Sequence, residues 1–130
     1  MMFNLFKKKE KESSRLVGLD IALKVSGFVT GKEHLHYGLW DKLDVNLDNL
    51  GKAQEAYTDL LFKYLPKKKK KIDILDIGGG AGENAKKLIA LGHKVTIIVP
   101  SKILAEHAKK NTDNKAKILI TTFEDYLPKN

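Results

Sequence analysis

The spacing of apolar residues along the chain changes near residue 71. Before that point apolar residues recur every three or four positions, which is the period of an α-helix. This spacing predicts one helix over 15–25, behind a serine that can cap it, and a longer helix over 49–65 that Pro66 ends. The stretch between them, 27–47, is rich in glycine, histidine and aspartate, and we expect it to be irregular.

Beyond residue 71, short runs rich in β-branched residues alternate with helical patterns. A strand–helix repeat of this kind is typical of right-handed crossovers and a parallel sheet. The predicted fold class is therefore α/β, with N-terminal helices ahead of the sheet. The elements expected are strands over 72–77, 94–99 and 116–121, helices over 83–91 and 102–110, and a final loop over 123–128.

Composition and charge narrow the class of protein. The chain has 130 residues, enough for one domain, and it has no cysteine, which excludes disulfides and thiolate metal sites and fits a cytoplasmic location. Its net charge of +8 comes entirely from lysine-rich runs at 7–11 and 67–71. We expect these runs to be solvated, with no specific nucleic-acid partner. The first lies in a predicted basic N-terminal tail, 1–13, with at most weak membrane-surface contact.

A glycine-rich loop follows the first predicted strand. Asp76 is followed by Gly78, Gly80 and Gly82 at alternate positions, just before a helix. Glycines at the carboxyl end of a strand allow positive φ angles and let the backbone approach a small polar ligand closely. The loop lacks the Gly-Lys-Ser/Thr ending of a phosphate loop, which excludes that site. A dinucleotide site fits poorly, because Glu83 stands at the sixth position, and a glycine turn without any ligand is a further alternative.

The pattern acid-x-Gly-x-Gly-x-Gly resembles the first motif of class I methyltransferases that use S-adenosylmethionine. The resemblance extends over 31–128, through the sequences at 34–40, 50–54, 92–96 and 123–126. It is nearest to the cyclopropane-fatty-acid synthase-like and tocopherol methyltransferase-like groups. It implies a Rossmann-like methyltransferase fold, with a helical lead-in or lid over 14–66 and a partial cofactor-binding domain over 67–130.

The resemblance also implies which residues hold the cofactor, S-adenosylmethionine. The loop would line its methionine end, residues after the second strand its ribose, and residues after the third strand its adenine. Lid residues would lie near the methyl group or the substrate entrance. No metal site is expected, since His34 and His36 lack a third ligand, and no catalytic base is assigned. These expected site residues are Asp76, Gly78, Gly79, Gly80 and Gly82 in the loop, Pro100 and Ser101, Phe123, Glu124 and Asp125, and His36, Tyr37 and Trp40 in the lid.

Two departures from the family pattern qualify the function that the resemblance implies. Val99 stands where most members have an acid that grips the ribose hydroxyls, which predicts weaker cofactor affinity. The pattern contains three strands where the family usually has seven, so the fold is expected to be truncated after the third parallel strand. Strand 72–77 would then be an edge open to a second chain or to self-association.

The function expected is the cofactor-binding portion of a methyltransferase that acts on a small-molecule or lipid-like acceptor, active as an enzyme if a partner completes it. One alternative is a non-catalytic methyltransferase-like subunit, or a truncated remnant, that acts by binding a partner chain. Another is a basic interaction module that acts through its lysine runs.

Overall fold

The computed structural model describes residues 14–66 and 71–127. The predicted basic tail 1–13, most of the second lysine run and residue 128 lie outside the described residues. The described part contains a parallel sheet of three strands in the order β1-β2-β3, so β1 is an edge strand as predicted. The strands are β1 (Asp73–Ile77), β2 (Lys94–Ile98) and β3 (Lys117–Leu119). The α/β class and the parallel pairing are confirmed.

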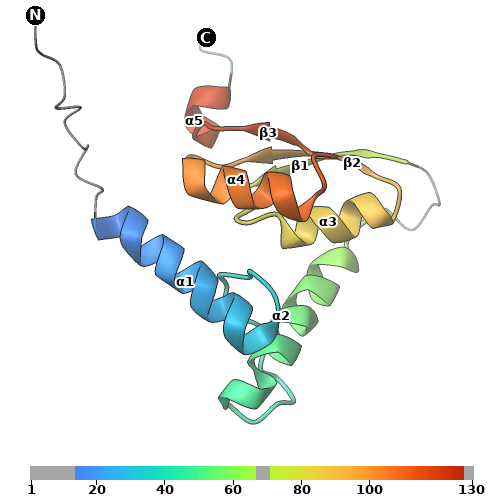
Figure 1. Cartoon of the computed structure of the whole chain (residues 1–130). Helices are drawn as coiled ribbons and strands as arrows, with labels where there is room; N and C mark the ends of the chain where they lie inside the picture. Colours follow the sequence, from blue (N-terminus) through green and yellow to red (C-terminus); the bar gives the residue numbers. More distant parts are fainter. Residues whose placement is uncertain (1–13, 67–70, 128–130) are drawn as a thin grey trace, which may run out of the picture.

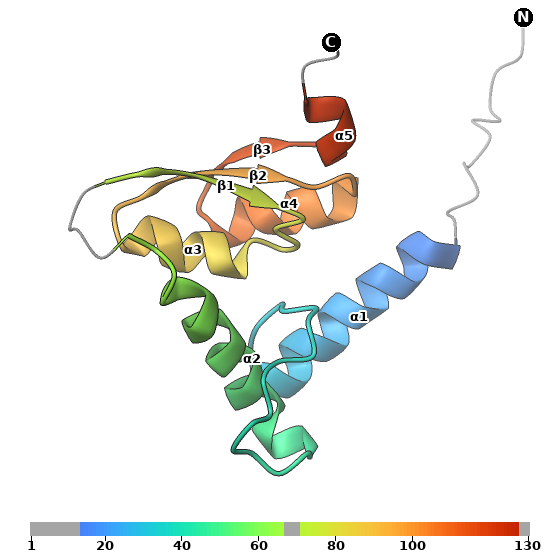
Figure 2. The same cartoon turned by 180° about the vertical axis from the view of Figure 1, so that it is seen from behind.

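Two helices cover one face of this sheet. They are α3 (Glu83–Ala90) and α4 (Lys102–Asn111), and both lie on the same side of the strands (Figures 1 and 2). Their small and apolar side chains pack onto β2, the central strand, whose Ile97 is fully buried. The core between sheet and helices consists of Ala85, Leu88, Val95, Ile97, Val99, Ala105 and Ala108.

Two longer helices precede the sheet and meet in a V (Figure 1). They are α1 (Ser14–Thr30) and α2 (Leu47–Phe62). The expected end of the first helix near residue 25 is wrong, because the Ser26 and Thr30 hydroxyls bond to nearby carbonyls and Gly31, with a φ of +71°, ends the helix. The irregular segment is therefore shorter than predicted and covers residues 31–46. The Asn46 side chain caps α2, which begins two residues earlier than predicted and ends at Phe62.

The end of the described chain also differs from the expectation. Residues Phe123–Tyr126 form a short helix, α5, where a loop was predicted. The Thr122 hydroxyl accepts a hydrogen bond from the Asp125 backbone N–H at 3.2 Å, which is an N-cap that stabilises the turn. Strand β3 is correspondingly shorter than its predicted range. No helix among the described residues is long and apolar enough to cross a membrane.

Candidate functional site

The glycine loop leaves β1 with the positive φ angles that its sequence predicts. Gly78, Gly80 and Gly82 have φ angles of +70°, +57° and +84°, which L side chains rarely adopt. The Gly78 N–H donates to the carbonyl of Ile98 at 2.8 Å, so the loop is anchored to the end of β2. This bond places the loop at the carboxyl edge of the sheet, where ligands of open α/β folds bind.

The four glycines of the loop have two different surroundings. A Cβ added to Gly79 would lie 2.6 Å from the Asp76 carboxylate, and one added to Gly82 would lie 3.0 Å from the Cα of Ala108 on α4. A Cβ on Gly78 or Gly80 would meet nothing within 4 Å. Gly79 and Gly82 therefore serve close packing inside the protein, whereas Gly78 and Gly80 face open space.

Asp76 is an acid in β1, one residue before the end of the strand. Its Oδ2 atom is buried and has no hydrogen-bond partner among the described residues. Burial raises the pKa of this carboxyl above its ordinary value. A buried acceptor without a donor is costly, so the side chain is poised to accept a hydrogen bond or a positive charge from outside the protein.

The loop borders a cleft of about 390 Å³ that lies between the sheet with its helices and the N-terminal helical part of the chain. One side of this glycine-loop cleft is formed by the end of β1, the loop and the start of α3. The other side comes from segment 33–36 and from α2. The lining residues are Glu33, His34, Leu35, His36, Tyr57, Leu61, Asp76, Ile77, Gly78, Gly79, Gly80, Ala81, Glu83 and Asn84.

Two histidines form the far side of the glycine-loop cleft. The rings of His34 and His36 lie 4.8 Å apart between centroids, and His36 lies equally far from Tyr57. The Gln54 side chain donates to the His36 carbonyl at 3.0 Å and fixes this segment against α2. Burial, with smaller contributions from His36 and nearby lysines, lowers the pKa of His34 to about 4, and burial also lowers that of His36. Both rings are therefore neutral near pH 7.

The structure brings together some of the expected site residues and separates others. Asp76, Gly78, Gly79, Gly80 and His36 all line the glycine-loop cleft. The other expected residues lie outside the lining of this cleft. Gly82 packs on α4, Pro100 is exposed, and Ser101 accepts a hydrogen bond from Leu104 N–H as the N-cap of α4. Tyr37 is 89% exposed, Trp40 donates to the Tyr37 carbonyl at 2.7 Å, and α5 contains Phe123, Glu124 and Asp125.

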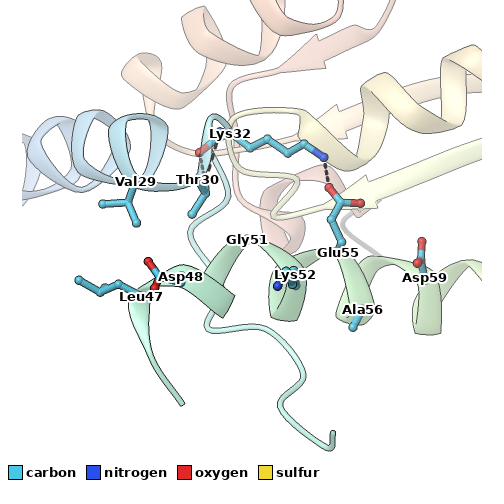
Figure 3. A pocket seen from close by; sticks show the side chains of 10 residues that line it. All are labelled: Val29, Thr30, Lys32, Leu47, Asp48, Gly51, Lys52, Glu55, Ala56 and Asp59. Atoms are coloured by element: carbon cyan, nitrogen blue, oxygen red, sulfur yellow. Dashed lines mark hydrogen bonds and ion pairs between the residues drawn. The ribbon is translucent and has the colours of Figure 1, made fainter. Parts of the chain in front are cut away.

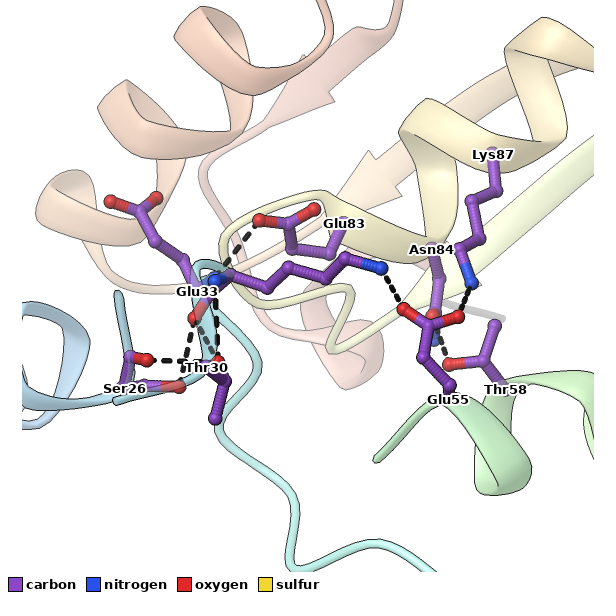
Figure 4. Close-up of polar contacts among 9 residues, drawn as sticks. Ser26, Thr30, Glu33, Glu55, Thr58, Glu83, Asn84 and Lys87 are labelled. Carbon is purple, nitrogen blue, oxygen red and sulfur yellow. Dashed lines mark hydrogen bonds and ion pairs between the residues drawn. The ribbon is translucent and has the colours of Figure 1, made fainter. Parts of the chain in front are cut away.

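Several polar residues that were not predicted from the sequence attach segment 31–36 to the sheet domain, which consists of β1–β3 with α3 and α4 (Figure 4). Glu55 on α2 forms ion pairs with both Lys32 and Lys87. Glu83 accepts a hydrogen bond from the Glu33 backbone N–H at 2.9 Å. The sequence carried one signal for these contacts, a carboxylate at a loop position where dinucleotide-binding proteins have glycine.

A larger groove of about 690 Å³ lies between α1 and α2 (Figure 3). Its walls carry both charge signs, and Lys32 pairs there with Glu55. None of its lining side chains holds a buried polar atom without a partner, whereas His34, His36 and Asp76 in the glycine-loop cleft do. The smaller cleft is therefore the stronger candidate for a ligand site.

Comparison with known proteins supports the fold. A scan against protein-family models and a search of curated proteins found no match. Among solved structures, a geranyl diphosphate methyltransferase in complex with GPP and sinefungin is 21% identical, with a TM-score of 0.59 over 78% of this chain and 44% of its own. The cyclopropane synthase MmaA2 from Mycobacterium tuberculosis is 25% identical, with a TM-score of 0.58 over 72% of this chain and 33% of its own.

Geranyl diphosphate C-methyltransferase from Streptomyces coelicolor A3(2), in complex with Mg2+, geranyl-S-thiolodiphosphate and S-adenosyl-L-homocysteine, is also similar. It is 16% identical, with a TM-score of 0.59 over 78% of this chain and 43% of its own. The chain spans less than half the length of each of these proteins. The chain therefore shares the Rossmann-like fold of these methyltransferase and cyclopropane synthase structures, as the sequence resemblance implied.

Proposed function

We propose that this chain is the S-adenosylmethionine-binding portion of a methyltransferase that acts on a small-molecule or lipid-like acceptor. The observation that carries the proposal is the Asp76 Oδ2 atom, which is buried without a donor from the described residues, beside two glycines that open into the glycine-loop cleft. The similar solved structures support it, since they include complexes with sinefungin, with S-adenosyl-L-homocysteine and with geranyl diphosphate.

The charges around the cleft favour this cofactor over a phosphate-bearing one. The lining of the cleft includes the carboxylates of Glu33, Asp76 and Glu83, and the described residues that line it include no lysine or arginine. Such a surface repels pyrophosphate and attracts a cation. S-adenosylmethionine carries a sulfonium and an ammonium group, so it fits the donor-free Asp76 oxygen and the acidic lining.

Each expected site residue then has a proposed role. When bound, the cofactor supplies an activated methyl group, and the chain supplies proximity, orientation and the exclusion of water. The glycine loop and Asp76 would hold the methionine end, and neutral His36 would face the reacting side of the cleft. Residues at the same edge of the sheet would approach the ribose (Pro100, Ser101) and the adenine (Phe123, Glu124, Asp125), and Tyr37 and Trp40 would belong to the lid.

A partner chain is the second part of the proposal. Within the described residues strand β1 has a neighbour on one side only, and its Leu75 and Ile77 are 38% and 51% exposed. Such an edge can pair with a further strand, from a second chain or from another copy of this one. A non-catalytic subunit that binds a partner through β1 is the alternative function that this observation favours. Both functions suit the reducing cytoplasm that a chain without cysteine fits.

Calorimetric titration of the full chain tests the cofactor assignment. We expect S-adenosylmethionine to release heat and ATP, which shares its adenosine but carries phosphates, to release none. Asp76→Asn should weaken binding of S-adenosylmethionine at least about tenfold, because an interaction with an ionised acceptor is lost. Gly18→Ala, in α1 and with nothing within 4 Å of the added Cβ, is the control and should bind like the wild type. Heat from ATP but none from S-adenosylmethionine would overturn the assignment.

Size-exclusion chromatography with light scattering tests the role of β1 separately. If the chain associates with itself through this edge, Leu75→Lys should lower the measured mass toward that of the monomer, because a charged side chain on an edge strand opposes pairing. Lys86→Glu, which changes an exposed charge on α3, should leave the mass unchanged. A wild-type mass that stays monomeric at high concentration would reject self-association and leave a different chain as the proposed partner.

A further inference from the structure

Glu33 makes contacts in two directions at the rim of the glycine-loop cleft. Its backbone N–H donates to Glu83 at the start of α3. Its side-chain Oε2 lies 2.7 Å from the Asn111 amide and 2.8 Å from Nδ1 of His107, both on α4. One residue of segment 31–36 therefore bonds to both helices that flank the glycine loop.

Asn111 extends this contact to the loop itself. Its side-chain nitrogen carries two hydrogens and donates one hydrogen bond to Glu33 and one to the carbonyl of Ala81, the latter at 2.9 Å. Ala81 lies between Gly80 and Gly82, which both have positive φ. The Glu33 carboxylate is therefore separated from the glycine loop by a single side chain.

The Glu33 side chain is only 24% exposed, so these bonds are partly shielded from water. Burial alone would raise the pKa of its carboxyl, but the hydrogen bonds from Asn111 and His107, together with the charges of His107 and Lys110, outweigh burial and lower it. The carboxylate is ionised near pH 7, and its hydrogen bonds are of the stronger, charge-assisted kind.

We propose that Glu33 is a positioning residue that couples the glycine loop to the histidine side of the cleft. The next residue in the chain is His34, whose ring contacts that of His36. Fixing residue 33 on Asn111 therefore fixes where the two histidines stand relative to Ala81 and the loop. This inference rests on the proposed function for its ligand, but the coupling itself is a property of the chain alone.

Amide hydrogen exchange on the full chain without ligand tests the coupling. Two amides report on it: that of Gly82, bonded to Gly79 O at 3.0 Å, and that of residue 33, bonded to Glu83. Glu33→Ala should speed the exchange of both about tenfold, because charge-assisted bonds are lost. The Val99 amide, bonded to Leu119 O between β2 and β3, should exchange at its wild-type rate.

Two further variants make the result specific. Glu33→Gln keeps an oxygen that can accept from Asn111, so its effect should be smaller than that of Glu33→Ala and it should recover part of the protection. Glu106→Gln removes an exposed carboxylate from α4 and should have no effect. If Glu33→Ala does not fold, the test compares the exchange rate of the Gly82 amide in Glu33→Gln with that in Glu106→Gln. The proposed coupling would be overturned if the Gly82 amide exchanged as slowly in the Glu33 variant as in Glu106→Gln.

Titration with S-adenosylmethionine then separates this inference from the proposed function. If the coupling and the function both hold, the Kd should rise about tenfold in Glu33→Ala and less in Glu33→Gln, while Glu106→Gln keeps the wild-type value. If wild-type chain binds no S-adenosylmethionine, the proposed function fails, and the exchange experiment still decides the coupling. Normal binding by Glu33→Ala, together with faster Gly82 exchange, would overturn the claim that the coupling positions the cofactor loop.

Discussion

The buried histidine at position 34 makes the stability of the protein sensitive to acid. Only 5% of His34 is exposed, its Nε2 atom has no hydrogen-bond partner among the described residues, and its pKa in the folded chain is about 4. In the unfolded chain the ring has its ordinary value of 6.5. At pH values between these two pKa values the ring is protonated in the unfolded state and neutral in the folded state, so acid favours unfolding.

The two pKa values set the size and the sign of the effect. The difference between 6.5 and about 4, at 1.36 kcal/mol per unit, corresponds to about 3 kcal/mol. This stability is fully present above pH 6.5 and is lost as the pH falls toward 4. The lowered pKa values of His36 and Glu33 act in the same direction, whereas the raised pKa of Asp76 acts in the opposite direction.

A comparison with His34→Leu isolates the contribution of this ring from those other groups. Urea denaturation at pH 7.5 and at pH 4.5 gives the free energy of unfolding of both proteins. Between these pH values the wild type should lose about 2.5 kcal/mol more than the variant. Parallel losses, within about 0.5 kcal/mol, would refute the reasoning, because they would mean that His34 takes up its proton without unfolding.

Three further predictions concern stability, and urea denaturation at pH 7.5 measures each of them. Gly38→Ala should lower the free energy of unfolding by about 2 kcal/mol or more, because its φ is +85° and the new Cβ would lie 2.5 Å from the Ala53 backbone. Gly18→Ala is the control and should raise the free energy of unfolding by up to about 1 kcal/mol. An unchanged midpoint for Gly38→Ala would contradict this close approach. Glu55→Gln should cost about 1 kcal/mol through its ion pairs with Lys32 and Lys87, and the loss should shrink in 1 M salt; a loss independent of salt would contradict an ionic origin. Ser101→Ala should cost about 1 kcal/mol through the N-cap of α4, and replacement by Asp in place of Ala should restore most of it.

The sheet domain could be predicted from local patterns. Runs of β-branched residues that alternate with helical patterns located the three strands, and Ser101 and Gly92 located helix ends. Each of these signals depends on residues that are adjacent in sequence. The positive φ of Gly78, Gly80 and Gly82 could also be predicted, since glycine adopts this conformation far more readily than residues with a Cβ. Helix α5 shows the limit of that reading: its cap, Thr122, is equally local, yet a four-residue helix has too few positions to show a period.

The histidine side of the cleft could not be predicted in the same way. Its placement depends on Gln54, which reaches back across 18 residues to the His36 carbonyl, and on Glu33, which reaches α4 across more than 70 residues. No periodicity encodes such pairs, because they form only once α2 and the sheet domain are packed. The extension of α1 to Thr30 has the same origin, since the Ser26 hydroxyl bonds to the carbonyl of His34 beyond the helix end.

Glu83 connects the ligand preference of the site to its architecture. In a dinucleotide-binding loop the residue at this position is a glycine that lets helix and strand pack closely, and a carboxylate there would face a pyrophosphate. Here the same carboxylate accepts the Glu33 N–H and so attaches segment 31–36, with its histidines, to the start of α3. Glu83 is thus one of the carboxylates that line the cleft and also the acceptor that holds its far side in place. This double role of Glu83 is consistent with the proposed cofactor, S-adenosylmethionine, which carries no phosphate.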